Sequence, residues 1–260
     1  MMMTFDNILR MAMAQSALDL SCETEDFCSL ENKVVISRRN DNAHKYLELP
    51  FFCQLVSYGN NVVASVSEEF APFAERYINH YGAVKCFETP ALLSLNEELM
   101  KHGYKVCFMA RYYLPVPALM VVHDCPYELK VMEKREFEKY YLPQFGNAIC
   151  AAHSERDVIA VGAFDGSELV GLAGASADCE SMWQIGVDVL PDYRRRGIAS
   201  AITSRLACEI MKAGKAPFYC AAWSNVRSER NAVKCGFRPA WVELTAKSID
   251  FVNKMYTTKE

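Results

Sequence analysis

The segment VDVLPDYRRRGIAS, from Val187 to Ser200, is the part of the sequence that is most informative about the structure. An apolar run typical of a strand ends at Val189, a turn rich in arginine follows, and a helical pattern begins after Gly197. The first N–H groups of a helix have no intrahelical acceptor, and the helix dipole adds partial positive charge at the same end. Gly197 and Ala199 carry little or no side chain, which lets a diphosphate approach the backbone closely. The stretch therefore predicts an anion site.

The three consecutive arginines of this turn, Arg194 to Arg196, have a second interpretation as a solvated charge run. Positive charge at the start of a helix is unfavourable with the helix dipole unless an anion compensates it. The arginines therefore favour the anion site over a merely exposed surface.

The segments around this turn predict an α/β fold of α+β type with a mixed, mostly antiparallel sheet and flanking helices. Downstream, Ile198, Ile202, Leu206 and Ile210 recur at four-residue steps and predict a helix with one apolar side that ends near Gly214. Upstream, Asp165-Gly166 between two apolar runs indicates a hairpin. We expect strands over 128–132, 158–164, 169–173, 182–189, 217–223 and 241–245, and helices over 136–153 and 228–235.

The N-terminal half is predicted to be a second small α/β unit. It begins with an amphipathic helix and continues with strands over 34–36, 51–58, 62–66 and 105–113 and helices over 68–81 and 92–102. The connection from Leu114 to Tyr127 contains three prolines and has no helical period. We therefore predict two domains, 1–120 and 121–260.

Composition excludes several classes of function. Hydrophobic residues make up 51% of the chain and the net charge is -4, so no basic excess indicates a nucleic-acid partner. No apolar run is long enough to cross a membrane. The eleven cysteines are an odd number without a C-x-x-C pair, which favours a reducing cytoplasm. The five histidines lack metal-ligand spacing, so we expect no metal. Nucleotide-hydrolase, dinucleotide, serine-hydrolase and zinc-protease motifs are missing from the sequence.

The order Arg194-x-x-Gly197-x-Ala199 after a strand resembles the acetyl-coenzyme A motif of the GNAT superfamily of N-acetyltransferases, whose pattern is Q/R-x-x-G-x-G/A. Asn225, Ser228 and Gly236-Phe237 resemble the second motif of that superfamily, in which a strand is followed by Asn, a short helix and a Gly-Phe turn. The resemblance covers residues 127–247.

This resemblance implies acetyl-CoA as co-substrate and a small-molecule amine or amino-acid derivative as acceptor. Backbone groups of Val187 and Val189 would pair with the pantetheine arm where two strands splay apart. A backbone N–H near Val187 would polarise the thioester carbonyl. The implied cofactor-binding residues are Val187, Asp188, Val189, Arg194, Arg195, Arg196, Gly197, Ile198, Ala199, Ser200, Asn225 and Ser228.

The catalytic acid and base are less clearly indicated by the sequence. Glu180 is the candidate base, against the alternative that it is only a surface residue. Many members of the superfamily place a tyrosine, as general acid, where this chain has Ala232. Tyr219 and Cys220 lie on the neighbouring strand, and the core is the favoured interpretation for both. The three tryptophans could line an acceptor pocket or simply pack.

The sequence leaves catalysis, acyl-chain length and oligomeric state open. Without a clear acid and base, the chain is also compatible with a non-catalytic acyl-CoA-binding or sensory module. The chemistry is compatible with a longer acyl group, and a homodimer is possible. In the N-terminal half, Ser67-Glu68-Glu69 stands where a coenzyme turn would need Arg and Gly, and its charge would repel phosphate. We therefore expect a degenerate GNAT-like domain that binds no coenzyme.

Overall fold

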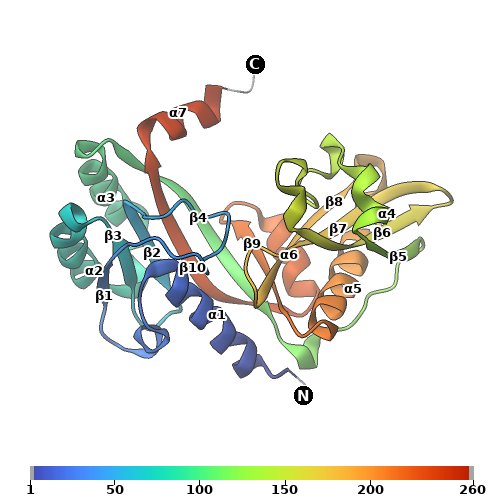
Figure 1. Ribbon diagram of the computed structural model, residues 1–260, viewed down its shortest axis with the longest axis horizontal. Helices are drawn as coiled ribbons and strands as arrows, with labels where there is room; N and C mark the ends of the chain where they lie inside the picture. The colour runs from blue at the N-terminus through green and yellow to red at the C-terminus, as the bar shows by residue number, and fades with distance from the viewer. Residues whose placement is uncertain (1–2, 258–260) are drawn as a thin grey trace. The chain divides into compact units, whose positions relative to one another are not determined.

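The computed structural model describes residues 3–257 and divides into two compact units (Figure 1). The first, which we call the motif unit because it contains the arginine-glycine turn, comprises residues 3–12 and 112–239. The second unit comprises residues 13–111 and 240–257. The units are therefore not two consecutive halves, and the expected boundary between residues 120 and 121 falls inside the motif unit.

The sheet of the motif unit has the mixed, mostly antiparallel character that the sequence predicts. Its strands are β5 (Glu128–Glu133), β6 (Asp157–Asp165), β7 (Glu168–Ser176), β8 (Met182–Val189) and β9 (Ala216–Ala222). They lie in the order β9-β8-β7-β6-β5. All neighbours in this run are antiparallel except β8 and β9, which are parallel. The predicted hairpin at Asp165-Gly166 joins β6 to β7.

One face of this sheet is covered by α5 (Ile198–Lys212). The four residues at four-residue steps, Ile198, Ile202, Leu206 and Ile210, are each at most 1% exposed. Burial of such a side chain contributes about 2 kcal/mol, so this stripe fixes α5 on the sheet. Gly171 of β7 allows α5 to pack close to the strand, since a Cβ at this position would lie only 2.6 Å from Ile198 Cγ2. The helix α6 (Val226–Lys234) follows β9.

The opposite face is covered by the segment between β5 and β6, and here the sequence prediction was wrong. In place of one helical region over 136–153, the structure has α4 (Lys134–Phe137) and the 3-10 turns η4 (Glu138–Tyr140), η5 (Pro143–Phe145) and η6 (Ala151–Arg156). Pro143 has no N–H to continue a helix. The N–H of Asn147 donates to the Asp188 carboxylate instead of to a helical carbonyl, and the N–H of Ala148 is shared between that carboxylate and the carbonyl of Phe145. Figure 1 shows α4 and α5 on opposite sides of the strands.

The second unit also has a mixed sheet with helices. Its strands run in the order β1-β3-β2-β10-β4, with β1 and β3 parallel and β2 antiparallel to both β3 and β10. Their bounds are β1 (Lys33–Ile36), β2 (Cys53–Ser57), β3 (Val63–Val66), β4 (Tyr104–Pro115) and β10 (Phe237–Ser248). The helices α2 (Ala71–Lys85) and α3 (Thr89–Lys101) pack on one face in a core that includes Leu55, Ile78 and Leu95. The strand-helix-helix-strand order expected for this half is present.

Two strands, β4 and β10, contribute residues to both units. Within the second unit, the N–H of Ile249 bonds to the carbonyl of Gly103 at 2.9 Å. Within the motif unit, the N–H of Val116 bonds to the carbonyl of Gly236 at 3.0 Å. From one pair to the other, the residue number on the first strand rises by as much as that on the second strand falls, which is the pattern of antiparallel pairing. Neither the length of β10 nor the helix after it, α7 (Ile249–Thr257), was predicted.

The remaining elements are short or lie near the N-terminus: α1 (Phe5–Leu20), η1 (Thr24–Cys28), η2 (Glu68–Phe70), η3 (Pro117–Leu119) and η7 (Pro191–Tyr193). In the part of the chain that the structure describes, no helix combines the length and apolarity needed to cross a membrane. All eleven cysteines are free thiols.

Candidate functional site

The parallel pairing of β8 with β9 stops partway along both strands. Residues 182–184 of β8 pair with residues 216–218 of β9. Beyond that register β8 continues to Val189 and β9 to Ala222, and no described strand pairs with β8 there on the side away from β7. The two strands therefore part after Gln184 and Phe218, as the sequence resemblance implies.

Hydrogen bonds at both ends of β8 show which backbone groups face the space between the parted strands. At one end the N–H of Leu190 donates to the carbonyl of Val170 in β7. At the other end the carbonyl of Ser181 accepts from Ala216 of β9. Peptide groups alternate sides along a strand, so even-numbered residues of β8 bond to β7 and odd-numbered residues face β9. The N–H and C=O of Val187 and the N–H of Val189 consequently face the parting.

The turn between β8 and α5 has the left-handed backbone that exposes amide hydrogens. Gly197 is the N-cap of α5 with φ of 83°, and Arg195 has φ of 63°. Among the described residues, none accepts a hydrogen bond from the N–H groups of Arg195, Arg196 or Gly197. The first-turn N–H groups of α5 lack intrahelical acceptors as well. Such a concave run of N–H groups binds anions.

The three arginines of the turn have different roles. Arg194 Nε donates to the carbonyl of Val189 at 3.0 Å. Arg196 donates to Tyr127 Oη at 2.6 Å and to the carbonyl of Asp192 at 3.0 Å. Arg195 is exposed and makes no hydrogen bond or ion pair with any residue in the described part of the chain. Two arginines therefore hold the turn in place, and Arg195 is the one available to an anion.

The side chains at the start of α5 point into the core. Ile198 is buried, and Ser200 Oγ donates to Asn231 Oδ1 of α6 at 3.2 Å. Ala199 is half-buried. These three residues can therefore offer a ligand their backbone N–H groups and not, in this arrangement, polar side-chain atoms.

Asn225 and Ser228 organise the start of α6. The Asn225 side chain is the N-cap and accepts from the N–H of Ser228 at 3.2 Å. Ser228 Oγ lies 2.7 Å from Tyr219 Oη, a hydrogen bond that either hydroxyl can donate. Tyr219 is 3% exposed, and burial raises the pKa of its phenol. Tyr219 therefore stays neutral on the β9 side of the parting. Ala232 is completely buried in the same core cluster.

Asp188, although it lies between Val187 and Val189, faces another way. Its backbone is in register with Leu172 of β7. Its carboxylate accepts from Asn147 N and Nδ2 at 2.8 Å each and from Ala148 N at 2.9 Å. Asp188 therefore clamps the segment that covers the sheet. The sequence carried no signal for this partner, which lies 41 residues away.

Glu180 lies before β8 begins, at the paired end of the strand, and is exposed. Its carbonyl accepts from Lys215 Nζ at 2.8 Å. At the parting itself the structure places Gln184, whose Nε2 lies 3.1 Å from Cys220 Sγ. Sequence reasoning missed Gln184, because only the register of β8 with β9 shows where the strands separate.

A buried carboxylate lies in the same row of the sheet. Asp157 of β6 pairs with Ser176, which pairs with Gln184. Asp157 is 3% exposed and accepts from Tyr141 Oη at 3.1 Å and from the N–H of Cys150 at 2.8 Å. Burial raises the pKa of this carboxyl. Within the described residues, no group of three or more His, Cys, Asp or Glu side chains could hold a metal ion.

Comparison with known proteins gives one family and several solved structures. The family model described as FR47-like protein matches residues 160–246. No curated protein matches the chain. A GCN5-related N-acetyltransferase-like protein from Streptococcus suis is 19% identical, with a TM-score of 0.45 over 62% of this chain and 68% of its own.

Two further solved structures have nearly the same sequence identity to this chain. A GCN5-related N-acetyltransferase from Kribbella flavida is 17% identical, with a TM-score of 0.47 over 60% of this chain and 64% of its own. The aminoglycoside N-acetyltransferase AAC(6')-Iy, solved in complex with CoA, is 18% identical, with a TM-score of 0.36 over 46% of this chain and 93% of its own. The chain thus spans about two thirds of the Streptococcus and Kribbella proteins.

The matched residues contain β7, β8, the arginine-glycine turn, α5, β9 and α6, and most of β6 and β10. Every element that builds the parted strands and the anion turn therefore lies inside the family match. Residues 160–246 match the FR47-like family model, and this match supports the GNAT resemblance of the sequence for that part of the chain.

Proposed function

We propose that this chain is an acetyl-CoA-dependent N-acetyltransferase that acts on a primary amine of a small molecule. The observation that carries the proposal is the combination of β8 and β9 parting after Gln184 with exposed amide hydrogens at the Gly197 turn. A diphosphate would accept hydrogen bonds from the N–H groups of the turn, and a pantetheine arm would pair with the backbone groups of Val187 and Val189. No other part of the described chain combines these two features.

The proposed reaction is direct attack of a neutral amine on the thioester carbon, with the coenzyme thiolate as leaving group. The N–H of Val187 would donate to the carbonyl oxygen as negative charge develops on it. The amine proton leaves through water, and Glu180, which is exposed, is the candidate that accepts it. Burial raises the pKa of the Tyr219 phenol, which makes it a poor proton donor, and Ala232 has no proton to donate. Departure of the coenzyme as a free thiolate is therefore the simplest path, since thiols are fairly acidic.

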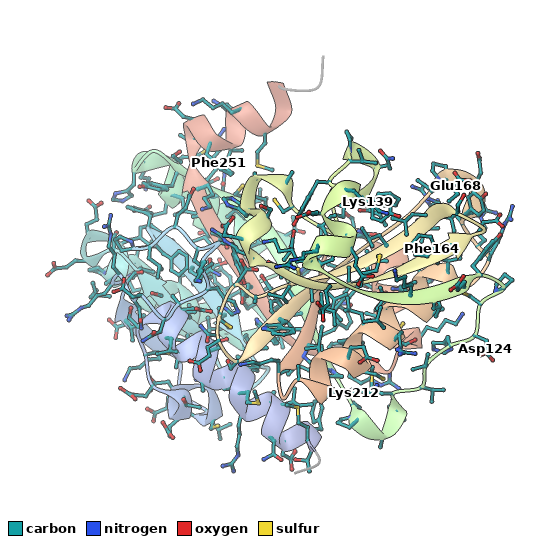
Figure 2. The ribbon with its side chains drawn as sticks, turned by 45° about the vertical axis from the view of Figure 1, so that its right-hand side comes forward. Asp124, Lys139, Phe164, Glu168, Lys212 and Phe251 are labelled. Atoms are coloured by element: carbon teal, nitrogen blue, oxygen red, sulfur yellow. The ribbon has the colours of Figure 1, made fainter. Side chains whose placement is uncertain are left out.

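Binding to the turn is tested by Gly197→Asp, with Gly197→Ala as matched control. A Cβ at Gly197 would lie 3.7 Å from the carbonyl of Asp124, so alanine fits in space, and its positive-φ strain is at least as large as that of aspartate (Figure 2 labels Asp124). Only aspartate adds negative charge against the phosphates. By calorimetry with coenzyme A, we expect wild type and Gly197→Ala to bind and Gly197→Asp to lose about a hundredfold or more in affinity. Equal binding by Gly197→Asp would refute the proposed coenzyme site.

Turnover separates the enzyme from the second candidate function, a non-catalytic acyl-CoA-binding sensor. That alternative is favoured by Ala232 and by the position of Glu180 outside the parting. The assay follows thiol release from acetyl-CoA with a panel of small amines, and a second series varies the acyl chain. Amine-dependent thiol release supports the transferase, whereas coenzyme binding without turnover on any amine supports the sensor. That the second unit is a degenerate GNAT-like domain remains part of the proposal.

A further inference from the structure

The second unit contains a cavity of its own, of about 300 Å³. The cavity lies where the end of β10, the start of β4, the start of α7 and the segment before β2 meet. Its volume is at the lower end of the range for small-molecule sites, and a cavity half that size holds benzene. One aromatic ring with a short substituent therefore fits. Its lining includes Glu48, Phe51, Phe52, Tyr104, Lys247 and Phe251.

Four of the ten residues that line this cavity are aromatic: Phe51, Phe52, Tyr104 and Phe251. The rings of Phe52 and Tyr104 are stacked, with centroids 4.0 Å apart and planes 8° from parallel. Phe51 is buried, while Phe251 of α7 is 36% exposed at the edge. Figure 2 labels Phe251 at the start of α7. Aromatic side chains pack best against another flat ring, so the shape and chemistry of the walls favour an aromatic guest.

One charged pair lies at the cavity. Lys247 Nζ lies 2.6 Å from Glu48 Oε2 and 5.4 Å from the centre of the Phe251 ring. The Lys247 side chain is 18% exposed, whereas that of Glu48 is 71% exposed. The Lys247 side chain is therefore largely covered by neighbouring residues of the cavity wall, whereas the Glu48 carboxylate contacts it from the solvent side. Ion pairs with a solvent-exposed member add little to stability, so another anion can replace Glu48 at Lys247.

We propose that this cavity binds a small aromatic carboxylate, with its ring against the aromatic wall and its carboxylate on Lys247 Nζ in place of Glu48. A cationic ligand is the weaker match, because Glu48, the one acidic residue among the described residues of the lining, has a carboxylate that lies mostly in water. The cavity shares no residue with the Gly197 turn or with the parted strands. The inference therefore stands or falls independently of the proposed transferase activity.

The test titrates the full chain with phenylacetate and with its neutral analogue phenylacetamide, followed by calorimetry. We expect wild type to bind phenylacetate about tenfold more tightly than phenylacetamide, the size of one charge-assisted contact. Lys247→Met should abolish that preference, and Lys247→Arg should keep it. Glu48→Gln should bind phenylacetate more tightly than wild type, because it removes the competing carboxylate. Cyclohexylacetate should bind more weakly than phenylacetate, because it lacks the flat ring.

Three results would overturn the inference. The first is no binding of phenylacetate or equal affinity for the amide, and the second is unchanged preference in Lys247→Met. The third is loss of phenylacetate binding in Gly197→Asp, which would place the ligand at the coenzyme turn. Melting temperatures of all variants check folding, and Glu48→Gln, which alters an exposed side chain, keeps the test decisive if Lys247→Met does not fold.

Discussion

Replacement of Gly186 by alanine should detach the segment that covers the sheet from β8. A Cβ on Gly186 would lie 1.9 Å from the carbonyl oxygen of Asn147 and 3.2 Å from the Cα of Ala148. Both are backbone atoms, so no side-chain rotation relieves the clash and the segment itself must move. The movement breaks the three hydrogen bonds that Asn147 and Ala148 donate to the Asp188 carboxylate.

The free energy of this change follows from its two parts. Overpacking against an immovable neighbour costs about 1–3 kcal/mol. Loss of the bonds to Asp188 adds about 1 kcal/mol in total, because Asn147 is exposed and water replaces part of them. Gly186→Ala should therefore lower the free energy of unfolding by about 3 kcal/mol, which corresponds to roughly 6–12 °C in melting temperature for a chain of this size.

Gly162→Ala is the matched control in the neighbouring part of the same sheet. The three atoms nearest to a Cβ there lie at the ends of the Leu169, Phe164 and Met132 side chains at 2.7–2.9 Å, and these side chains can rotate away. Its cost should stay below about 1.5 kcal/mol. Urea unfolding followed by tryptophan fluorescence measures both variants. Equal destabilisation by the two would refute the argument, as would additive costs in the double variant Gly186→Ala/Asp188→Ala, because one displaced segment should account for both changes.

Two further predictions concern buried titratable groups. Burial raises the pKa of Asp157, so the stabilisation from its protonated form is present below the unfolded pKa and is lost as pH rises through the folded one. Asp157→Asn, which retains acceptors for Tyr141 and Cys150, should match or exceed wild-type stability at pH 7 in urea unfolding, and a loss above about 1 kcal/mol would contradict this. Burial also raises the pKa of Cys53 and Cys235 to about 12, so at pH 8 alkylation mapped by mass spectrometry should modify the exposed Cys28 and Cys150 and leave these two intact. Modification of Cys53 at the rate of Cys28 in the folded chain would contradict the second expectation.

The motif unit was largely predictable because its elements carry local signals. The four-residue spacing from Ile198 to Ile210 and the Asp165-Gly166 hairpin gave α5, β6 and β7 with small errors at their ends. The segment 136–153 was predicted as helical because its composition is compatible with a helix. What breaks the helix is partly local, at Pro143, and partly the distant Asp188, which takes up the N–H of Asn147 that a helix would use.

The candidate site was predictable as a set of residues and not as a set of roles. The sequence grouped Arg194, Arg195 and Arg196 together, but contacts with Val189 and Tyr127 distinguish them, and these depend on the folded turn. Asp188 was included among the cofactor-binding residues because it lies between Val187 and Val189. The alternation of peptide groups along β8, however, turns those of Asp188 toward β7. The cavity beside Lys247 had no signal in the sequence, since its residues come from three separate stretches.

The way β4 and β10 are shared has a consequence for synthesis on the ribosome. The side chain of Gln54 in β2 bonds to that of Glu243 in β10, 189 positions later in the sequence. The second unit begins at residue 13, but it lacks an interior strand until residues 240–248 have been made. Chain segments that emerge early must wait for their last strand, and pairings between such distant residues form slowly. A nascent chain would thus expose the unpaired edge of β2 to chaperones or to other chains for most of its translation.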